Sequence, residues 1–86
     1  MTTWLAQILV GLKAAVNDPQ GLAIRGALHQ LGFADVTSVR AGKFFELRLT
    51  APDRETAESQ VAEMCRRLLA NPVIEDYSFE LKENVS

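Results

Sequence analysis

Apolar and polar residues alternate along three stretches of this chain, and a period of two is the pattern of a half-buried β-strand. The first stretch, Trp4 to Leu12, is apolar on one parity and also carries Leu5 and Leu9 on the other. A strand that is apolar on both faces needs cover on both faces. In a chain of 86 residues, we expect part of that cover to come from another subunit.

The second alternating stretch, Val39 to Thr50, is the one around which the other elements are arranged. Its odd positions are apolar except for Lys43, which follows Gly42. This interruption leaves two alternatives: a hairpin that turns at Ala41-Gly42, or one long strand that a bulge bends at the glycine. The first central residue of a two-residue hairpin loop needs positive φ, which alanine adopts poorly, so we favour the bent strand.

The third alternating stretch runs from Val73 to about Leu81. The side chains expected to point inward are Val73, Tyr77, Phe79 and Leu81, and those expected to point outward are Asp76, Ser78, Glu80 and Lys82. The last residues, 82–86, are expected to form a frayed tail because chain ends fray unless other residues hold them.

Two further stretches have apolar residues three and four positions apart, which predicts amphipathic helices. Asp18 can cap the first helix because its carboxylate accepts free N–H groups, and Pro19 loses no hydrogen bond at the first helical position. This helix runs to about Leu31, and Gly32 can end it in a left-handed conformation. Its expected buried face consists of Ile24, Ala27, Leu28 and Leu31.

The second helix follows the same plan. Asp53 is its expected N-cap, and Glu55 lies near the positive end of the helix dipole. Asn71 followed by Pro72 ends it. Its expected buried face consists of Ala57, Val61, Met64, Cys65 and Leu68.

The predicted order of elements is strand, helix, strand, strand, helix, strand, with the two middle strands joined into one if the bend at Gly42 is continuous. Each half is a β-α-β unit, and such pairs form a ferredoxin-like α+β domain in which two helices cover one face of the sheet. We therefore expect a single two-layer domain over residues 1–86. A chain this short buries a small fraction of its surface, so dimer formation would help to stabilise it.

Composition excludes several classes of function. The net charge is −2, so no overall field attracts nucleic acid or an anionic membrane, and Glu46 interrupts the small basic group Arg40, Lys43 and Arg48. No apolar run approaches the ~20 residues that a bilayer span requires. The first residues lack an export signal, and together with a single cysteine this predicts a cytoplasmic protein.

Side chains that could carry out chemistry are few and scattered. His29 is interpreted as a solvated or half-buried helix residue, since no cysteine or carboxylate stands at ligand spacing. Cys65 shares an apolar stripe and is interpreted as a small buried hydrophobe. Glu75 and Asp76 point to opposite faces of a strand. The chain has no metal-ligand spacing, phosphate loop or nucleophile elbow. It therefore predicts no catalytic, cofactor-binding or metal-binding residue and favours a binding or assembly module.

Three stretches of the chain form a more specific combination. They are Asp18-Pro19-Gln20-Gly21 with the helix end Leu31-Gly32; Val39-Arg40-Ala41-Gly42-Lys43-Phe44 with Glu46-Leu47; and Met64 to Tyr77, which includes Asn71-Pro72 and Asp76-Tyr77. Each is weak alone, but together they resemble the PurS family, the small subunit of phosphoribosylformylglycinamidine (FGAM) synthase in de novo purine synthesis. The resemblance covers nearly the whole chain. Ala14-Ala15, Asn17 and Pro72 depart from the family's usual residues without touching a catalytic group.

The resemblance implies an assembly role. In that family a large synthetase subunit binds ATP, magnesium and formylglycinamide ribonucleotide, and a glutaminase subunit releases ammonia from glutamine. The small subunit forms dimers, or dimers of dimers, that bridge the two larger chains and help to enclose the ammonia path. It would bind no cofactor itself. The alternative, from a different class, is a small ferredoxin-like regulatory module that binds a metabolite between subunits, because this fold hosts many functions.

Eight residues match the family's motifs and are candidates for contact with the chain's own copies or with the larger subunits. They are Asp18, Gln20, Gly21, Arg40, Gly42, Lys43, Asp76 and Tyr77. Several have a competing structural role: Asp18 as a helix cap, Gly42 as a bend and Tyr77 as a core residue. For Arg40 and Lys43 the competing role is a solvated edge. We expect the double substitution Arg40→Glu with Lys43→Glu to leave the fold intact and to weaken assembly with the synthetase.

Overall fold

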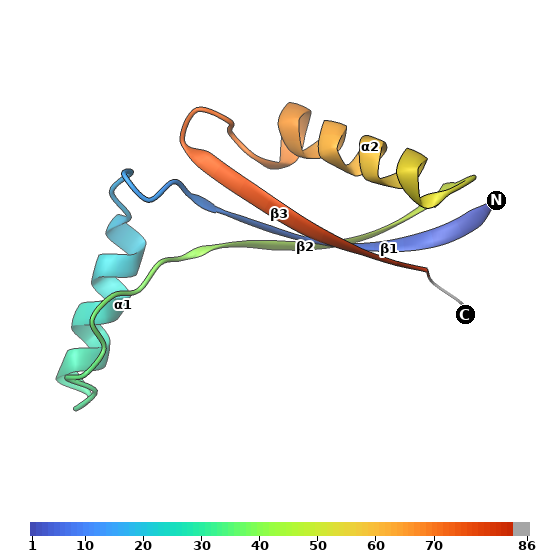
Figure 1. Cartoon of the computed structure of the whole chain (residues 1–86). Helices are drawn as coiled ribbons and strands as arrows, with labels where there is room; N and C mark the ends of the chain where they lie inside the picture. The colour runs from blue at the N-terminus through green and yellow to red at the C-terminus, as the bar shows by residue number, and fades with distance from the viewer. Residues whose placement is uncertain (84–86) are drawn as a thin grey trace.

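A computed structural model describes residues 1–83 of the chain and shows a three-stranded sheet in the order β2-β1-β3 (Figure 1). The strands are β1 (Thr2–Leu12), β2 (Gly42–Ala51) and β3 (Glu75–Glu83). Both outer strands pair with β1 in the antiparallel direction. The stretch that is apolar on both faces is thus the central strand of the sheet.

The second strand is single, and the hairpin alternative is wrong. Residues of β2 pair with those of β1 without a gap, from Gly11 opposite Gly42 to Thr2 opposite Ala51. A bulge would put two residues opposite one, so none lies inside this paired stretch. The strand starts at Gly42, whose role is close approach: a Cβ built there would lie 2.5 Å from the carbonyl oxygen of Val10.

The hydrophobic core lies between the sheet and α2 (Arg54–Met64), which crosses one face of the sheet (Figure 1). The buried apolar residues are Trp4, Ala6, Ile8, Val10, Ala51, Ala57, Val61, Cys65, Ala70 and Leu81. Phe45, Leu47, Leu49, Leu69, Tyr77 and Phe79 pack around them and are half-buried. The alternation in all three strands therefore selects the face that α2 covers, as the sequence predicts.

The end of α2 differs from the prediction because the helix widens there. A π-helical turn, η1 (Cys65–Leu69), follows α2, and the N–H of Ala70 donates to the carbonyl oxygen of Cys65, 2.9 Å away. A π-turn closes over five residues in place of four and so rotates the side chains that follow. Leu69 packs on the core instead of Leu68, which is 83% exposed. The predicted burial of Leu68 is wrong for this reason.

The first helix, α1 (Pro19–Gln30), lies beyond the end of the sheet (Figure 1). The molecule is accordingly elongated, with extents of 51 × 31 × 14 Å. The predicted burial of the apolar face of α1 is wrong within this single chain: Leu31 is 73% exposed, Ile24 is 39% exposed and Ala27 is exposed, while Leu28 is half-buried. Spacing identifies an apolar stripe, but it does not say which surface covers that stripe.

Both ends of α1 are confirmed. Asp18 caps its start, and Pro19 is the first helical residue. At the other end Gly32 has φ +100° and its N–H donates to the carbonyl oxygen of His29 at 3.1 Å. The N–H of Phe33 donates to the carbonyl oxygen of Leu28 at 2.9 Å, which completes a Schellman motif.

The α+β class and the ferredoxin-like order of elements are confirmed, with the two middle strands present as one. Two details of the last strand are corrected. Val73 is 79% exposed because it lies in the turn before β3. Lys82 and Glu83 belong to β3, so neither is part of a frayed tail; the remaining positions of that predicted tail, 84–86, lie outside the described residues.

Candidate functional site

The eight candidate contact residues gather at one end of the sheet. They are Asp18, Gln20, Gly21, Arg40, Gly42, Lys43, Asp76 and Tyr77. On β1, Gly11 lies between Gly42 of β2 and Asp76 of β3. The neighbouring position, Val10, lies between Lys43 and Tyr77. Since α1 also starts here, residues far apart in the sequence form one surface, which we call the junction and define by the eight residues above.

Asp18 fastens α1 to the start of β2. One carboxylate oxygen accepts the N–H of Gly21 at 2.9 Å, and the other accepts the N–H of Ala41 at 2.7 Å. The side chain is 5% exposed. The hydrogen bond from Ala41, followed by that from Gly21, holds the pKa of this carboxyl below its usual range. Asp18 is therefore a buried anion whose two oxygens already have partners, which makes it a structural residue of the junction.

Gly21 is held in place by the lack of room for a side chain. A Cβ at this position would lie 2.2 Å from the carbonyl oxygen of Val39 and 2.8 Å from a carboxylate oxygen of Asp18. Any other residue would push the chain before β2 away from α1. The conformation of the backbone is not the cause, since the only positive-φ residue among 1–83 is Gly32.

Arg40 also has an internal role. Its Nη2 donates to the carbonyl oxygens of Lys13 and Val16, each at 3.0 Å, and lies 3.5 Å from that of Leu12. It thereby closes the loop between β1 and α1. The interpretation of Arg40 as a solvated edge residue is wrong, and a glutamate there would set a carboxylate against backbone carbonyls. The double substitution at Arg40 and Lys43 is therefore not expected to leave the fold intact.

The remaining residues of the junction divide between surface and core. Gln20 is exposed, and the Nζ of Lys43 lies 4.0 Å from a carboxylate oxygen of Glu75. Asp76 pairs with Lys13 at 3.0 Å and is 72% exposed. Exposed pairs of this kind contribute little to stability and can exchange partners. Tyr77 instead stacks on Phe79, with ring centroids 6.5 Å apart, as a core residue would. Gln20, Lys43 and Asp76 are thus free to meet another chain.

The face of the sheet away from α2 carries an apolar patch that adjoins the junction. Leu9 and Phe44 lie opposite each other on β1 and β2, and each is 57% exposed. Beside them an open hollow of about 500 Å³ extends over the end of the sheet, where Gly11 and Gly42 add no side-chain bulk. The second apolar parity of β1 is therefore uncovered in the single chain, and its cover by another subunit stays a prediction.

The potential chemical groups have structural surroundings. His29 is half-buried and its Nε2 donates to the carbonyl oxygen of Val36 at 2.8 Å. Cys65 is buried, and burial raises the pKa of its thiol, which disfavours the reactive thiolate. Within residues 1–83, no group of three or more His, Cys, Asp or Glu could hold a metal ion. No helix of that part of the chain is long and apolar enough to cross a membrane.

Sequence reasoning missed two polar residues of this region. Lys13 pairs with Asp76, and Glu75 both approaches Lys43 and accepts the N–H of Asn71 at 2.7 Å. The partners of Lys13 are set by the antiparallel register, which brings together residues 63 positions apart. A local pattern carries no signal for such a pair.

Comparison with known proteins gives a consistent result. The family model described as "PurS: Phosphoribosylformylglycinamidine (FGAM) synthase" matches residues 5–83. The chain is 51% identical to the FGAM synthase subunit PurS of Synechocystis sp., over 87% of this chain and 75% of that protein. It is 46% identical to the PurS subunit of Bacillus subtilis, over 93% and 94% of the two chains.

Solved structures agree with this result. The crystal structure of B. subtilis PurS aligns with a TM-score of 0.84 at 45% identity and covers 93% of this chain and 99% of that one. A chain of the PurLQS structure from Thermotoga maritima aligns with a TM-score of 0.85 at 33% identity and covers 98% of this chain and 100% of that one.

Proposed function

This chain belongs to the PurS family, and from this premise we propose that it is the small, non-catalytic subunit of a glutamine-dependent FGAM synthase in de novo purine biosynthesis. The observation that carries the proposal is the match over residues 5–83, together with the likeness to a chain of the PurLQS structure. The match also supports a single PurS-like domain. The structure supplies a physical reason for an assembly role: its candidate contacts lie on one surface, and its one histidine and one cysteine have structural surroundings.

The partners in this proposal are a large synthetase subunit and a glutaminase subunit. The synthetase would bind ATP, magnesium and formylglycinamide ribonucleotide, and the glutaminase would supply ammonia from glutamine. Ammonia is mostly protonated at neutral pH, and only its neutral form is nucleophilic. A route that excludes water would therefore protect it, and a small bridging subunit helps to enclose such a route. This work would take place in the cytoplasm.

The chain would also associate with a second copy of itself. A ferredoxin-like sheet has two helices on one face, yet α2 alone crosses that face here and leaves Phe45, Leu47 and Phe79 half-buried. The displaced α1 has 12 residues, a length at which an isolated helix is marginal in water. In this proposal the α1 of each copy covers apolar surface of the other.

Reconstitution tests the proposed function directly. The synthetase and glutaminase are assayed with and without this chain, once with glutamine and once with added ammonium chloride as nitrogen source. We expect omission of the chain to abolish glutamine-driven synthesis and to leave ammonia-driven synthesis largely intact. Glutamine-driven synthesis that proceeds at full rate without this chain would reject a coupling role.

A further inference from the structure

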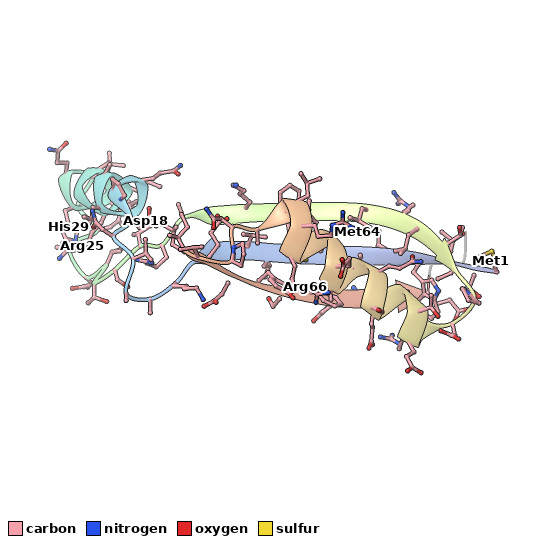
Figure 2. All side chains as sticks on the ribbon, turned by 90° about the horizontal axis from the view of Figure 1, so that it is seen from above. Met1, Asp18, Arg25, His29, Met64 and Arg66 are labelled. Atoms are coloured by element: carbon pink, nitrogen blue, oxygen red, sulfur yellow. The ribbon has the colours of Figure 1, made fainter. Side chains whose placement is uncertain are left out.

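A small cavity lies between α1 and the segment that leads back to the sheet. This segment, residues 33–41, runs alongside α1 toward β2 (Figure 1). The hydrogen bond from His29 to Val36 holds the two together. Figure 2 shows Asp18 at the sheet end of α1, with Arg25 and His29 on the side of the helix that faces the segment. The cavity has a volume of about 160 Å³, and its lining includes Asn17, Asp18, Arg25, Thr37 and Ser38.

Arg25 is the unusual member of this lining. Its Nε is buried and has no hydrogen-bond partner among residues 1–83. No carboxylate of the same part of the chain lies within 4.0 Å of its guanidinium, whereas Lys13, Arg54 and Arg66 each have one. Buried polar groups almost always have a partner, and a buried cationic donor without one is costly. The site is thus short of one acceptor.

The charges around the cavity leave it positive. Arg25 and Arg40 both line it, against the single carboxylate of Asp18. Both oxygens of that carboxylate already accept backbone N–H groups, from Gly21 at 2.9 Å and Ala41 at 2.7 Å. The Asp18 anion is therefore occupied within the fold and does not reach across to neutralise Arg25.

Further donors line the cavity. The hydroxyls of Thr37 and Ser38 and the side-chain amide of Asn17 make no hydrogen bond to other groups of residues 1–83. At ~30 Å³ per water molecule, a volume of about 160 Å³ holds a group of roughly five heavy atoms. Arginine matches a tetrahedral oxyanion well because its fork presents two parallel N–H donors.

We propose that this cavity binds a phosphate-class oxyanion, held by the Nε side of Arg25 with donors from Asn17, Thr37 and Ser38. A planar carboxylate presents only two oxygens, whereas a phosphoryl group can accept from donors on several sides. The shared chemistry fits free phosphate and the phosphoryl end of a phosphorylated metabolite. The inference stands on the geometry of α1 and its neighbouring segment and does not depend on the proposed function.

The experiment uses the full chain, labelled with nitrogen-15, in a buffer of constant ionic strength set by sodium chloride. Inorganic phosphate, ribose 5-phosphate and acetate are titrated separately, and the Nε–H resonance of Arg25 is followed by NMR together with the backbone amides of residues 37 and 38. Calorimetry gives the affinities. This reads the wild-type site directly, so the result does not depend on whether a variant folds.

We expect saturable shifts with phosphate and weak or no shifts with acetate. Arg25→Gln should weaken phosphate binding by about tenfold or more, because a charged bidentate contact is lost. The matched control is Arg48→Gln, an exposed arginine of β2 outside the cavity and without an ion pair in residues 1–83; it should bind as the wild type does. Tighter binding of ribose 5-phosphate than of phosphate would identify a phosphorylated metabolite as the source, and equal binding would identify free phosphate.

Three results would overturn the proposal. The first is the absence of saturable phosphate shifts at the Arg25 Nε–H. The second is an equal response to acetate, which would show a general anion effect. The third is equal weakening by Arg48→Gln, which would show that phosphate responds to the charge of the whole chain.

Discussion

The two helices of this protein carry the same local signals but have different surroundings. Each starts at an aspartate cap that accepts backbone N–H groups, and each has apolar residues at helical spacing. α2 lies on the sheet and buries Ala57 and Val61, whereas α1 lies beyond it, and its only buried residue is Gly21. The α2 half therefore holds the fold together, and the α1 half offers apolar surface to other chains.

The largest expected effect uses the same substitution in both halves. Ile8→Ala removes a fully buried side chain under α2 and should lower the free energy of unfolding by about 2–5 kcal/mol. Ile24→Ala removes the same atoms from α1, where the side chain is 39% exposed, and should cost under about 1 kcal/mol. Urea unfolding at low protein concentration measures both. Equal losses would show that α1 is as well packed as the core.

The second comparison concerns self-association. Leu31 at the end of α1 is 73% exposed, and Leu68 at the end of α2 is 83% exposed. If a second copy covers α1, Leu31→Ser should weaken dimer formation by roughly 1.5–3 kcal/mol, the cost of failing to bury a leucine. Leu68→Ser is the control and should change it little. Sedimentation equilibrium gives the two dissociation constants, and a dimer unaffected by Leu31→Ser would place the interface elsewhere.

The third comparison lies within α1. Gly21→Ala would force a Cβ against the carbonyl oxygen of Val39, and overpacking of this kind costs about 1–3 kcal/mol. Gly26→Ala meets nothing within 4 Å and should stabilise the helix by about 0.5–1 kcal/mol. Hydrogen exchange should therefore become faster in α1 for Gly21→Ala and slower for Gly26→Ala, with β1 unchanged in both. Faster exchange throughout β1 would show that the two halves unfold as one unit.

The fourth comparison is between the two caps and uses pH. Backbone hydrogen bonds lower the pKa of Asp18, chiefly that from Ala41, and of Asp53, chiefly that from Thr56. A carboxyl with a lowered pKa in the folded state stabilises the protein above its unfolded pKa of about 4, and this contribution is lost as pH falls through the folded pKa. Asp18→Asn and Asp53→Asn should each flatten the fall in stability on the acid side. Acid unfolding curves that stay equally steep in both variants would contradict the assignment.

The smallest expected effect is at the junction surface. Because Arg40 bonds to backbone carbonyls, Lys43→Glu alone is the cleaner test of contact with the synthetase. It breaks an exposed pair with Glu75 at 4.0 Å, so stability should change by under about 1 kcal/mol. We expect slower association with the synthetase, as for a charge at the rim of an interface. Surface plasmon resonance measures the rate, with Lys82→Glu on β3 as the control; equal rates for all three proteins would remove Lys43 from the interface.

Several features of the fold follow from the sequence because they depend on neighbours along the chain. Asp18, Asp53 and Gly32 perform the capping and stopping roles that their residue types predict. Strand alternation also identifies the inward residues Phe79 and Leu81. Leu68 is the instructive failure: a π-turn changes the helical period by a residue, and nothing in a run of apolar and basic residues marks that change.

The candidate site was predictable as a set of residues and not as a set of roles. The motifs identify Asp18, Gly21 and Arg40, but only the structure shows that all three face other parts of the same chain. Gly21 must be glycine because a carbonyl from Val39 approaches it, and Arg25 lines a cavity that residues 37 and 38 complete. These roles depend on distances between segments that the sequence keeps apart.

By itself, the sequence determined which segments are strands and helices, where the helices start and stop, and which family the chain resembles. Those properties arise from backbone hydrogen bonding and side-chain spacing over a few residues. Only the tertiary structure decided that α2 covers the sheet while α1 does not, that Arg40 closes a loop, and that Arg25 lacks an acceptor. The reason is that burial and pairing depend on which distant surfaces meet, and an amphipathic stripe can be covered equally well by its own sheet or by another copy's.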